Sequence, residues 1–132
     1  MKEVLDSRFL IEHYYSDKKE TIQRTTRKLR NLALRKEGII PTIVISETVK
    51  TICERIGKEE AEICYLDIVT SNLQIQELTS KIAKQAGLLK CQHKGIPMGD
   101  CIIAATAVIN QARIISDDPH YDSIKETKRC WI

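Results

Sequence analysis

Short apolar segments alternate along this chain with longer stretches in which apolar residues recur at helical spacing. The expected strands cover residues 3–5, 39–45, 73–75 and 112–115, with residues 128–132 as a closing edge strand. The expected helices cover residues 9–15, 22–33, 49–56, 61–69, 82–89 and 101–107. Because strands and helices alternate, the pattern predicts an α/β fold with a mainly parallel central sheet and helices on both faces, a three-layer α/β/α architecture.

The length and composition of the chain fit one such unit. Its 132 residues contain no internal repeat and no linker-like stretch, so we expect a single domain over residues 1–132. The five cysteines are widely spaced and form no CxxC pair, which disfavours a zinc site and favours reduced thiols. No stretch resembles a signal peptide or a membrane span, and we therefore expect a cytoplasmic protein with no membrane contact.

Acidic residues follow the expected strands or open the helices after them. Asp6 follows the first strand, Glu47 follows the strand at 39–45, and Asp100 opens the alanine-rich helix after Gly99. Asp117 and Asp118 follow the strand at 112–115. Because parallel strands end at one edge of the sheet, these carboxylates are expected to gather at that edge.

Each acid taken alone also has a structural interpretation. Asp6 and Asp100 stand where helices begin and could cap them, Glu47 suits the first turn of a helix, and Asp118 before Pro119 suits a turn. Four separate structural acids need not converge, however, whereas a hard divalent cation needs several oxygen ligands from different elements. The conjunction therefore predicts a Mg²⁺ or Mn²⁺ site suited to metal-assisted phosphodiester hydrolysis.

Together with the stretch from Gly99 to Ala107 and the Ser116-x-Asp118 turn, this layout resembles the PIN-domain family of metal-dependent ribonucleases, including the VapC-type toxins. The resemblance spans nearly the whole chain. It implies that Asp6, Glu47, Asp100 and Asp118 are the catalytic and metal-binding acids. It further implies RNA as the substrate, endonucleolytic cleavage, a homodimer and, for a toxin, a small antitoxin protein as partner.

Several neighbouring residues are assigned less firmly by the sequence. Asp117 and Asp118 compete for the fourth acidic position, and spacing from Ser116 favours Asp118. Ser7 and Ser116 match small polar positions of the family, so they and Asp117 are candidates for contacts that support the acids. His120 stands two residues after Asp118, where it could contact phosphate, but we interpret it as a packing or surface residue.

Basic residues crowd the segment between residues 18 and 36, although the chain as a whole carries only +3. At helical spacing Arg24, Arg27, Lys28 and Arg35 share roughly one side. This side could follow a phosphate backbone, it could be a solvated helix face, or it could bind an acidic protein segment. The sequence leaves these three interpretations open.

Three other functions compete with a toxin nuclease. The chain could be a housekeeping RNA-processing nuclease without an antitoxin, or a non-catalytic PIN-like module that binds RNA or protein. It could also be a receiver- or phosphatase-type domain that binds Mg²⁺ for phosphoryl transfer, but we find no convincing set of an Asp nucleophile with a partner Lys or Thr. Retention of all four acids argues against the non-catalytic module.

Overall fold

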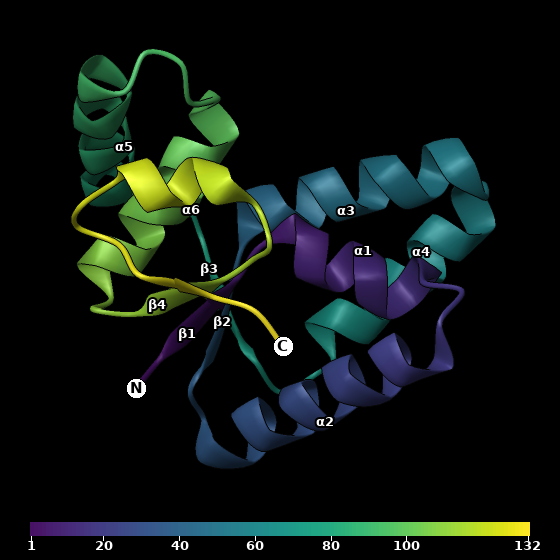
Figure 1. Cartoon of the computed structure of the whole chain (residues 1–132). Coiled ribbons are helices and arrows are strands. Elements are labelled where there is room, and N and C mark those ends of the chain that lie inside the picture. The colour runs from purple at the N-terminus through teal and green to yellow at the C-terminus, as the bar shows by residue number, and fades with distance from the viewer.

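The computed structural model describes residues 1–132 and has a five-stranded parallel sheet at its centre, with strand order β3-β2-β1-β4-β5 (Figure 1). The strands are β1 (Glu3–Leu5), β2 (Gly38–Pro41), β3 (Gln74–Gln76), β4 (Arg113–Ile115) and β5 (Arg129–Cys130). The helices are α1 (Ser7–Tyr15), α2 (Lys19–Arg35), α3 (Thr42–Arg55), α4 (Lys58–Val69), α5 (Ser80–Gln92) and α6 (Met98–Ile109), with a 3₁₀ helix η1 (Pro119–Ser123). The α/β class and the parallel sheet are confirmed.

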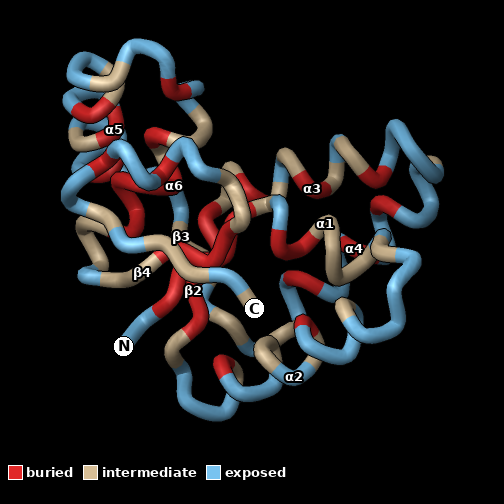
Figure 2. The backbone as a smooth tube through the Cα atoms, viewed as in Figure 1, coloured by how far each residue is buried: buried red, intermediate tan, exposed pale blue.

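Helices cover the sheet on both sides, with α5 and α6 on one side and α1 to α4 on the other (Figure 1). The middle strand β1 and its neighbours β2 and β4 are almost entirely buried, and Figure 2 shows the buried backbone concentrated along them and along α6. Helix α6 contacts β1, β4 and α5, and its small residues Cys101, Ala104 and Ala105 are fully buried. This close packing holds the start of α6 against the carboxyl edge of the sheet.

The strand expected at residues 39–45 is shorter than its sequence predicts. Strand β2 ends at Pro41, and α3 begins at Thr42, so the apolar run through Ile43, Val44 and Ile45 is helical. Proline fixes the backbone at the turn from strand to helix. Three β-branched residues in sequence favour a strand, but here packing overrides that preference, since Val44 is completely buried on the helix. Glu47 consequently lies in the second turn of α3 and not in the first.

The expected closing strand forms at the chain's C-terminal end. Arg129 and Cys130 pair in parallel with Ile114 and Ile115 at the edge of the sheet. This pairing brings the last residues back across the front of the sheet, close to α1 and α2 (Figure 1). None of the helices combines the length and the apolar character needed to cross a lipid bilayer.

Candidate metal-dependent active site

Asp6 lies directly after β1, where it serves as the N-cap of α1. One carboxylate oxygen accepts a hydrogen bond from the amide of Ser7 at 2.8 Å, and the other accepts one from the Ser116 hydroxyl at 2.6 Å. The residue is only 2% exposed, and no basic side chain pairs with it. Burial raises the pKa of Asp6, and the nearby negative charge of Asp100 raises it further. A buried carboxylate without a cation is thus built into the middle of the sheet's edge.

Glu47 projects from α3 toward the same place. Its Oε1 is buried and has no hydrogen-bond partner. Burial is the main cause that raises the pKa of Glu47, followed by the charges of Asp6 and Asp100. The start of α6 approaches it so closely that a Cβ added to Gly99 would lie 3.1 Å from Glu47 Oε2. Glycine at position 99 therefore allows Glu47 and Asp100 to share one site.

Asp100, Asp118 and His120 form the more exposed part of this cluster. His120 Nδ1 lies 3.1 Å from Asp100 Oδ2 and 3.4 Å from Asp118 Oδ1. One ligand atom from each of the three residues lies within 4.8 Å of the others. The hydrogen bond with Asp100 and the charge of Asp118 raise the pKa of His120. The two carboxylates thus favour a positive charge at the point between them.

Ser116 connects the buried and exposed parts of the cluster. Its hydroxyl donates to Asp6 and accepts a hydrogen bond from the backbone amide of Asp118 at 3.0 Å. Asp118 in turn caps η1 by accepting from the His120 amide at 2.9 Å. One fully buried hydroxyl therefore fixes the turn after β4 relative to the end of β1.

Asp117 pairs with Arg8 and not with the cluster. Arg8 donates to both oxygens of Asp117, at 2.5 and 3.2 Å, and holds the pKa of this carboxyl below its ordinary value. Because Asp117 already has a cation and Asp118 faces Asp100 and His120, the geometry supports Asp118 as the fourth acid. Arg8 thus acts as the partner of Asp117.

Sequence reasoning did not find Tyr121 and preferred a packing or surface role for His120. His120 is exposed in the structure, but the turn at Pro119 also folds η1 over the start of α6 and brings the His120 ring to Asp100. The buried Tyr121 on the same turn donates weakly to Asp100 Oδ1 at 3.5 Å, and burial raises the pKa of its phenol far above the ordinary range. The sequence signal for both was their place just after the acidic turn.

The donor set fits a divalent cation. It offers carboxylate oxygens from four elements and one imidazole nitrogen, and the buried Oε1 of Glu47 lacks any partner within the chain. Burial raises the pKa values of Asp6 and Glu47, and the negative charges of their acidic neighbours raise them further. Oxygen ligands with at most one imidazole suit Mg²⁺ or Mn²⁺ better than copper or a structural zinc ion.

Comparison with models of known protein families identifies the family to which this fold belongs. The model of the PIN domain matches residues 4–127, and the chain therefore belongs to the PIN domain family. No curated protein sequence matches the chain.

Solved structures with the same fold come from toxin–antitoxin systems. The chain is similar to VapBC2 from Rickettsia felis, solved with a promoter DNA fragment, with a TM-score of 0.78, 22% identity and coverage of 99% of this chain and 98% of the other. It is also similar to DNA-bound VapBC from Salmonella typhimurium (TM-score 0.76, 15% identity, coverage 99% and 98%). The sarcin-ricin loop cleaving toxin VapC20 from Mycobacterium tuberculosis has a TM-score of 0.73, 13% identity and coverage of 94% and 95%. At these identities the likeness shows the fold.

Proposed function

We propose that this chain, acting as one domain over residues 1–132, is a metal-dependent endoribonuclease. The observation that carries the proposal is a set of carboxylates in which buried Asp6 and partly buried Glu47 lie beside Asp100 and Asp118, with no lysine or arginine paired to any of them. Burying several negative charges together is costly unless a cation joins them. The site is therefore best explained as a binding place for Mg²⁺ or Mn²⁺.

Asp6, Glu47, Asp100 and Asp118 are the residues proposed to hold the cation, with His120 beside them. A bound divalent cation supplies a Lewis acid for the phosphoryl group and lowers the pKa of a coordinated water. The chain itself fixes the ligands, since Ser116 and the Ser7 amide hold Asp6 in one orientation. Preorganised ligands of this kind cost no rearrangement when the substrate arrives.

Two residues are placed to handle protons and substrate charge. Glu47 has a raised pKa and a free buried oxygen, so it is suited to orient the attacking water and accept its proton. The His120 side chain is 49% exposed at the mouth of the cluster, where its ring N–H can donate a hydrogen bond to a phosphate oxygen of the substrate. No nucleophile of the chain forms a covalent intermediate in this scheme, and water attacks directly.

The biological role that we propose is that of the toxin in a toxin–antitoxin pair. The structural relatives that support it are two DNA-bound VapBC complexes and VapC20, a toxin that cleaves the sarcin-ricin loop. The partners would then be RNA, a small antitoxin and a second copy of the chain in a homodimer, and the protein would act in the cytoplasm. Growth arrest on expression, relieved by a protein encoded next to the gene, distinguishes this role from housekeeping RNA processing.

The test of the activity is cleavage of a panel of single-stranded and structured RNAs by the purified chain. We expect cutting with Mg²⁺ or Mn²⁺, none with EDTA, and loss of cutting in Asp100→Asn. Glu54→Gln is the matched control because it removes an exposed carboxylate from α3, away from the cluster. A folded wild-type chain that binds the metal and cuts no RNA in the panel would contradict the proposal and favour a non-catalytic module.

A further inference from the structure

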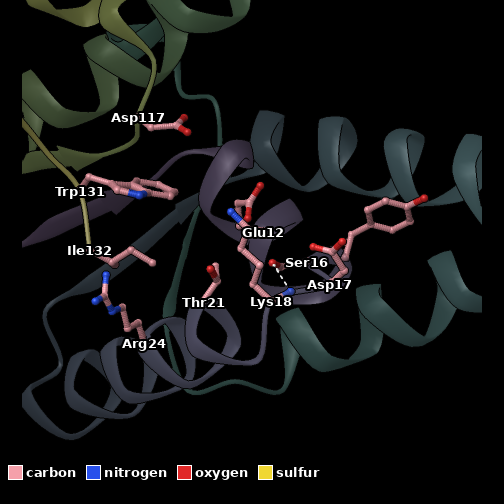
Figure 3. A pocket seen from close by; sticks show the side chains of 10 residues that line it. Glu12, Ser16, Asp17, Lys18, Thr21, Arg24, Asp117, Trp131 and Ile132 are labelled. Carbon is pink, nitrogen blue, oxygen red and sulfur yellow. Dashed lines mark hydrogen bonds between the residues drawn. The ribbon is translucent and has the colours of Figure 1, made fainter.

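A hollow lies beside the turn that carries Asp117 and Asp118. It has a volume of about 710 Å³ and lies between the end of α1, the start of α2 and the last residues of the chain (Figure 3). Asp117, the neighbour of Asp118, lies on its wall, so the hollow opens next to the proposed active site. Its volume falls within the range typical of pockets that hold small ligands, roughly 300–1,000 Å³.

Trp131 provides an aromatic surface in this hollow. Its ring meets the ring of Phe9 edge-on, with centroids 6.3 Å apart and planes at 80°. Phe9 is fully buried in the core, so this contact holds the indole in one orientation, while 36% of Trp131 stays exposed. Figure 3 shows the indole projecting into the hollow toward Glu12. A fixed, half-exposed indole is a surface on which an unpaired base can stack.

Two arginine side chains without an acidic partner lie on α2 beside the hollow. Arg24 lines the hollow and also lines a smaller depression of about 200 Å³ together with Arg27, Lys28 and Asn31. Arg24 and Arg27 are exposed and have no carboxylate within 4.0 Å, whereas Lys28 pairs with Glu3. Helix α2 carries six basic residues and one acid, so the positive charge of the chain is concentrated on it.

We propose that the hollow and the adjoining face of α2 bind single-stranded RNA. One unpaired base stacks on Trp131, and the phosphates on one side of it contact Arg24 and Arg27. The inference rests on the proposed function for the choice of RNA. It adds the residues that hold the substrate next to the cluster. It also specifies single-stranded RNA, because a base in a duplex is not free to stack on a side chain.

The acids in the hollow favour RNA over an acidic peptide. Glu12 and Asp17 line it, and Asp117 is already neutralised by Arg8. The first two repel the carboxylates of a peptide, but they accept hydrogen bonds from the exocyclic amino group of a base. The cations at the hollow are Lys18, just before α2, and Arg24 on α2, and with Arg27 they follow the path of a backbone that leaves the hollow along this helix. This arrangement predicts a preference for amino-bearing bases, namely cytosine, adenine or guanine, over uracil.

Trp131 is the only tryptophan of the chain, so intrinsic fluorescence reports on this residue alone. The experiment titrates oligocytidine, oligoadenosine, oligouridine, a duplex RNA and oligoglutamate into the Asp100→Asn chain with Mg²⁺, where cutting is expected to be absent. We expect saturable quenching by oligocytidine and oligoadenosine, weaker quenching by oligouridine, and none by the duplex or oligoglutamate. Equal quenching by the duplex or by oligoglutamate would overturn the inference, as would no quenching by any single strand.

Substitutions then test the two contacts separately, with labelled RNA and fluorescence anisotropy as the readout. Trp131→Leu is expected to weaken binding of oligocytidine by roughly 5- to 150-fold, the range for loss of one stacking contact. Arg24→Gln is expected to weaken it and to lower the salt dependence by about one counterion. Arg30→Gln is the matched control, because Arg30 is exposed on the same helix but points about 120° away from Arg24.

Unchanged affinity in folded Arg24→Gln, or an equal loss in Arg24→Gln and Arg30→Gln, would overturn the phosphate contact and with it the inference. Trp131→Phe keeps an aromatic ring against Phe9 and is expected to retain most of the affinity even if Trp131→Leu is poorly folded. The result is separable from the activity itself. Cleavage without quenching refutes this site and keeps the nuclease, whereas quenching without any cleavage keeps the site and refutes the nuclease.

Discussion

A buried carboxylate lies at each end of strand β1, but only the carboxylate at the amino end is paired with basic side chains. At the amino end, Glu3 is 2% exposed, and it pairs with Lys28 at 2.5 Å and with Arg113. Just beyond the carboxyl end, Asp6 is equally buried but is held only by a serine hydroxyl and a backbone amide. Its charged neighbours Glu47 and Asp100 are also negative.

This difference separates a structural acid from an acid that serves a site. A buried charge is stable only when something of opposite sign stands beside it. The chain supplies both cations for Glu3, so the buried charge at that end of the sheet is neutralised without a bound ion. At the other end the chain supplies only acids and one histidine at the mouth, and the missing positive charge is the one that a metal ion would bring.

The largest effect is expected when the two neighbouring acids of the last turn are compared. Asp118→Asn should lower RNA cleavage by about 100- to 1,000-fold, because loss of a metal ligand removes several kcal/mol of transition-state stabilisation. Asp117→Asn should change it only a few-fold, since Asp117 pairs with Arg8 and not with the cluster. Initial rates with Mg²⁺ measure both, and a greater loss in Asp117→Asn would reverse the assignment of the fourth acid.

Glu3→Gln is expected to give the next largest effect, on stability. It leaves Lys28 and Arg113 without their shared partner, which we expect to lower the free energy of unfolding by about 2–3 kcal/mol. The value is below that for a fully buried pair because the side chains of Lys28 and Arg113 are 28% and 42% exposed. Urea unfolding measures it, and a neutral effect would show that the amino end does not depend on this pairing.

Glu47→Gln should act in the opposite direction in the absence of metal. Removing one of several like charges should raise the free energy of unfolding in EDTA by about 1 kcal/mol, and the new amide can donate to the neighbouring carboxylates. Mg²⁺ should stabilise this variant less than it stabilises the wild type. Glu54→Gln on the same helix should stay within about 0.5 kcal/mol of the wild type. A lower free energy of unfolding for Glu47→Gln than for the wild type in EDTA would contradict the proposed repulsion among the acids.

The smallest effect is expected from the exposed pair of Arg8 and Asp117. The pKa of Asp117 is lowered in the folded state, so the pair contributes fully above the ordinary carboxyl pKa of 3.8 and loses its contribution as the pH falls below that value. Arg8→Gln should cost about 0.5 kcal/mol at pH 7 and low salt. The difference from the wild type should shrink as the pH falls below 3.8 and in 1 M salt, and a difference that does not shrink would rule out an electrostatic origin.

Much of this architecture follows from local sequence patterns. The alternation of apolar segments and helical stretches predicts the parallel sheet, and acids that follow strands or open a helix predict Asp6, Asp100 and Asp118 at one edge. The end of β2 was not predictable in this way, because residues 42–45 have the composition of a strand and only packing makes them helical.

The contacts that could not be predicted from the sequence join residues far apart in the chain. Arg113 and Glu3 are 110 residues apart, Arg8 and Asp117 are 109 apart, and only the folded sheet shows which acids have a cation. His120 reaches Asp100 through a turn whose path depends on how η1 packs over α6. Sequence spacing thus indicates which acids meet, but it does not show which of them are neutralised.

The most direct test of the central claim is calorimetric titration of Mn²⁺ into the purified wild-type chain and into Asp100→Asn. The account predicts saturable binding to the wild type that is lost or greatly weakened in Asp100→Asn and unchanged in Glu54→Gln. Equal binding by wild type and Asp100→Asn, or no binding by the folded wild type, would contradict the claim that the uncompensated carboxylates form a metal site.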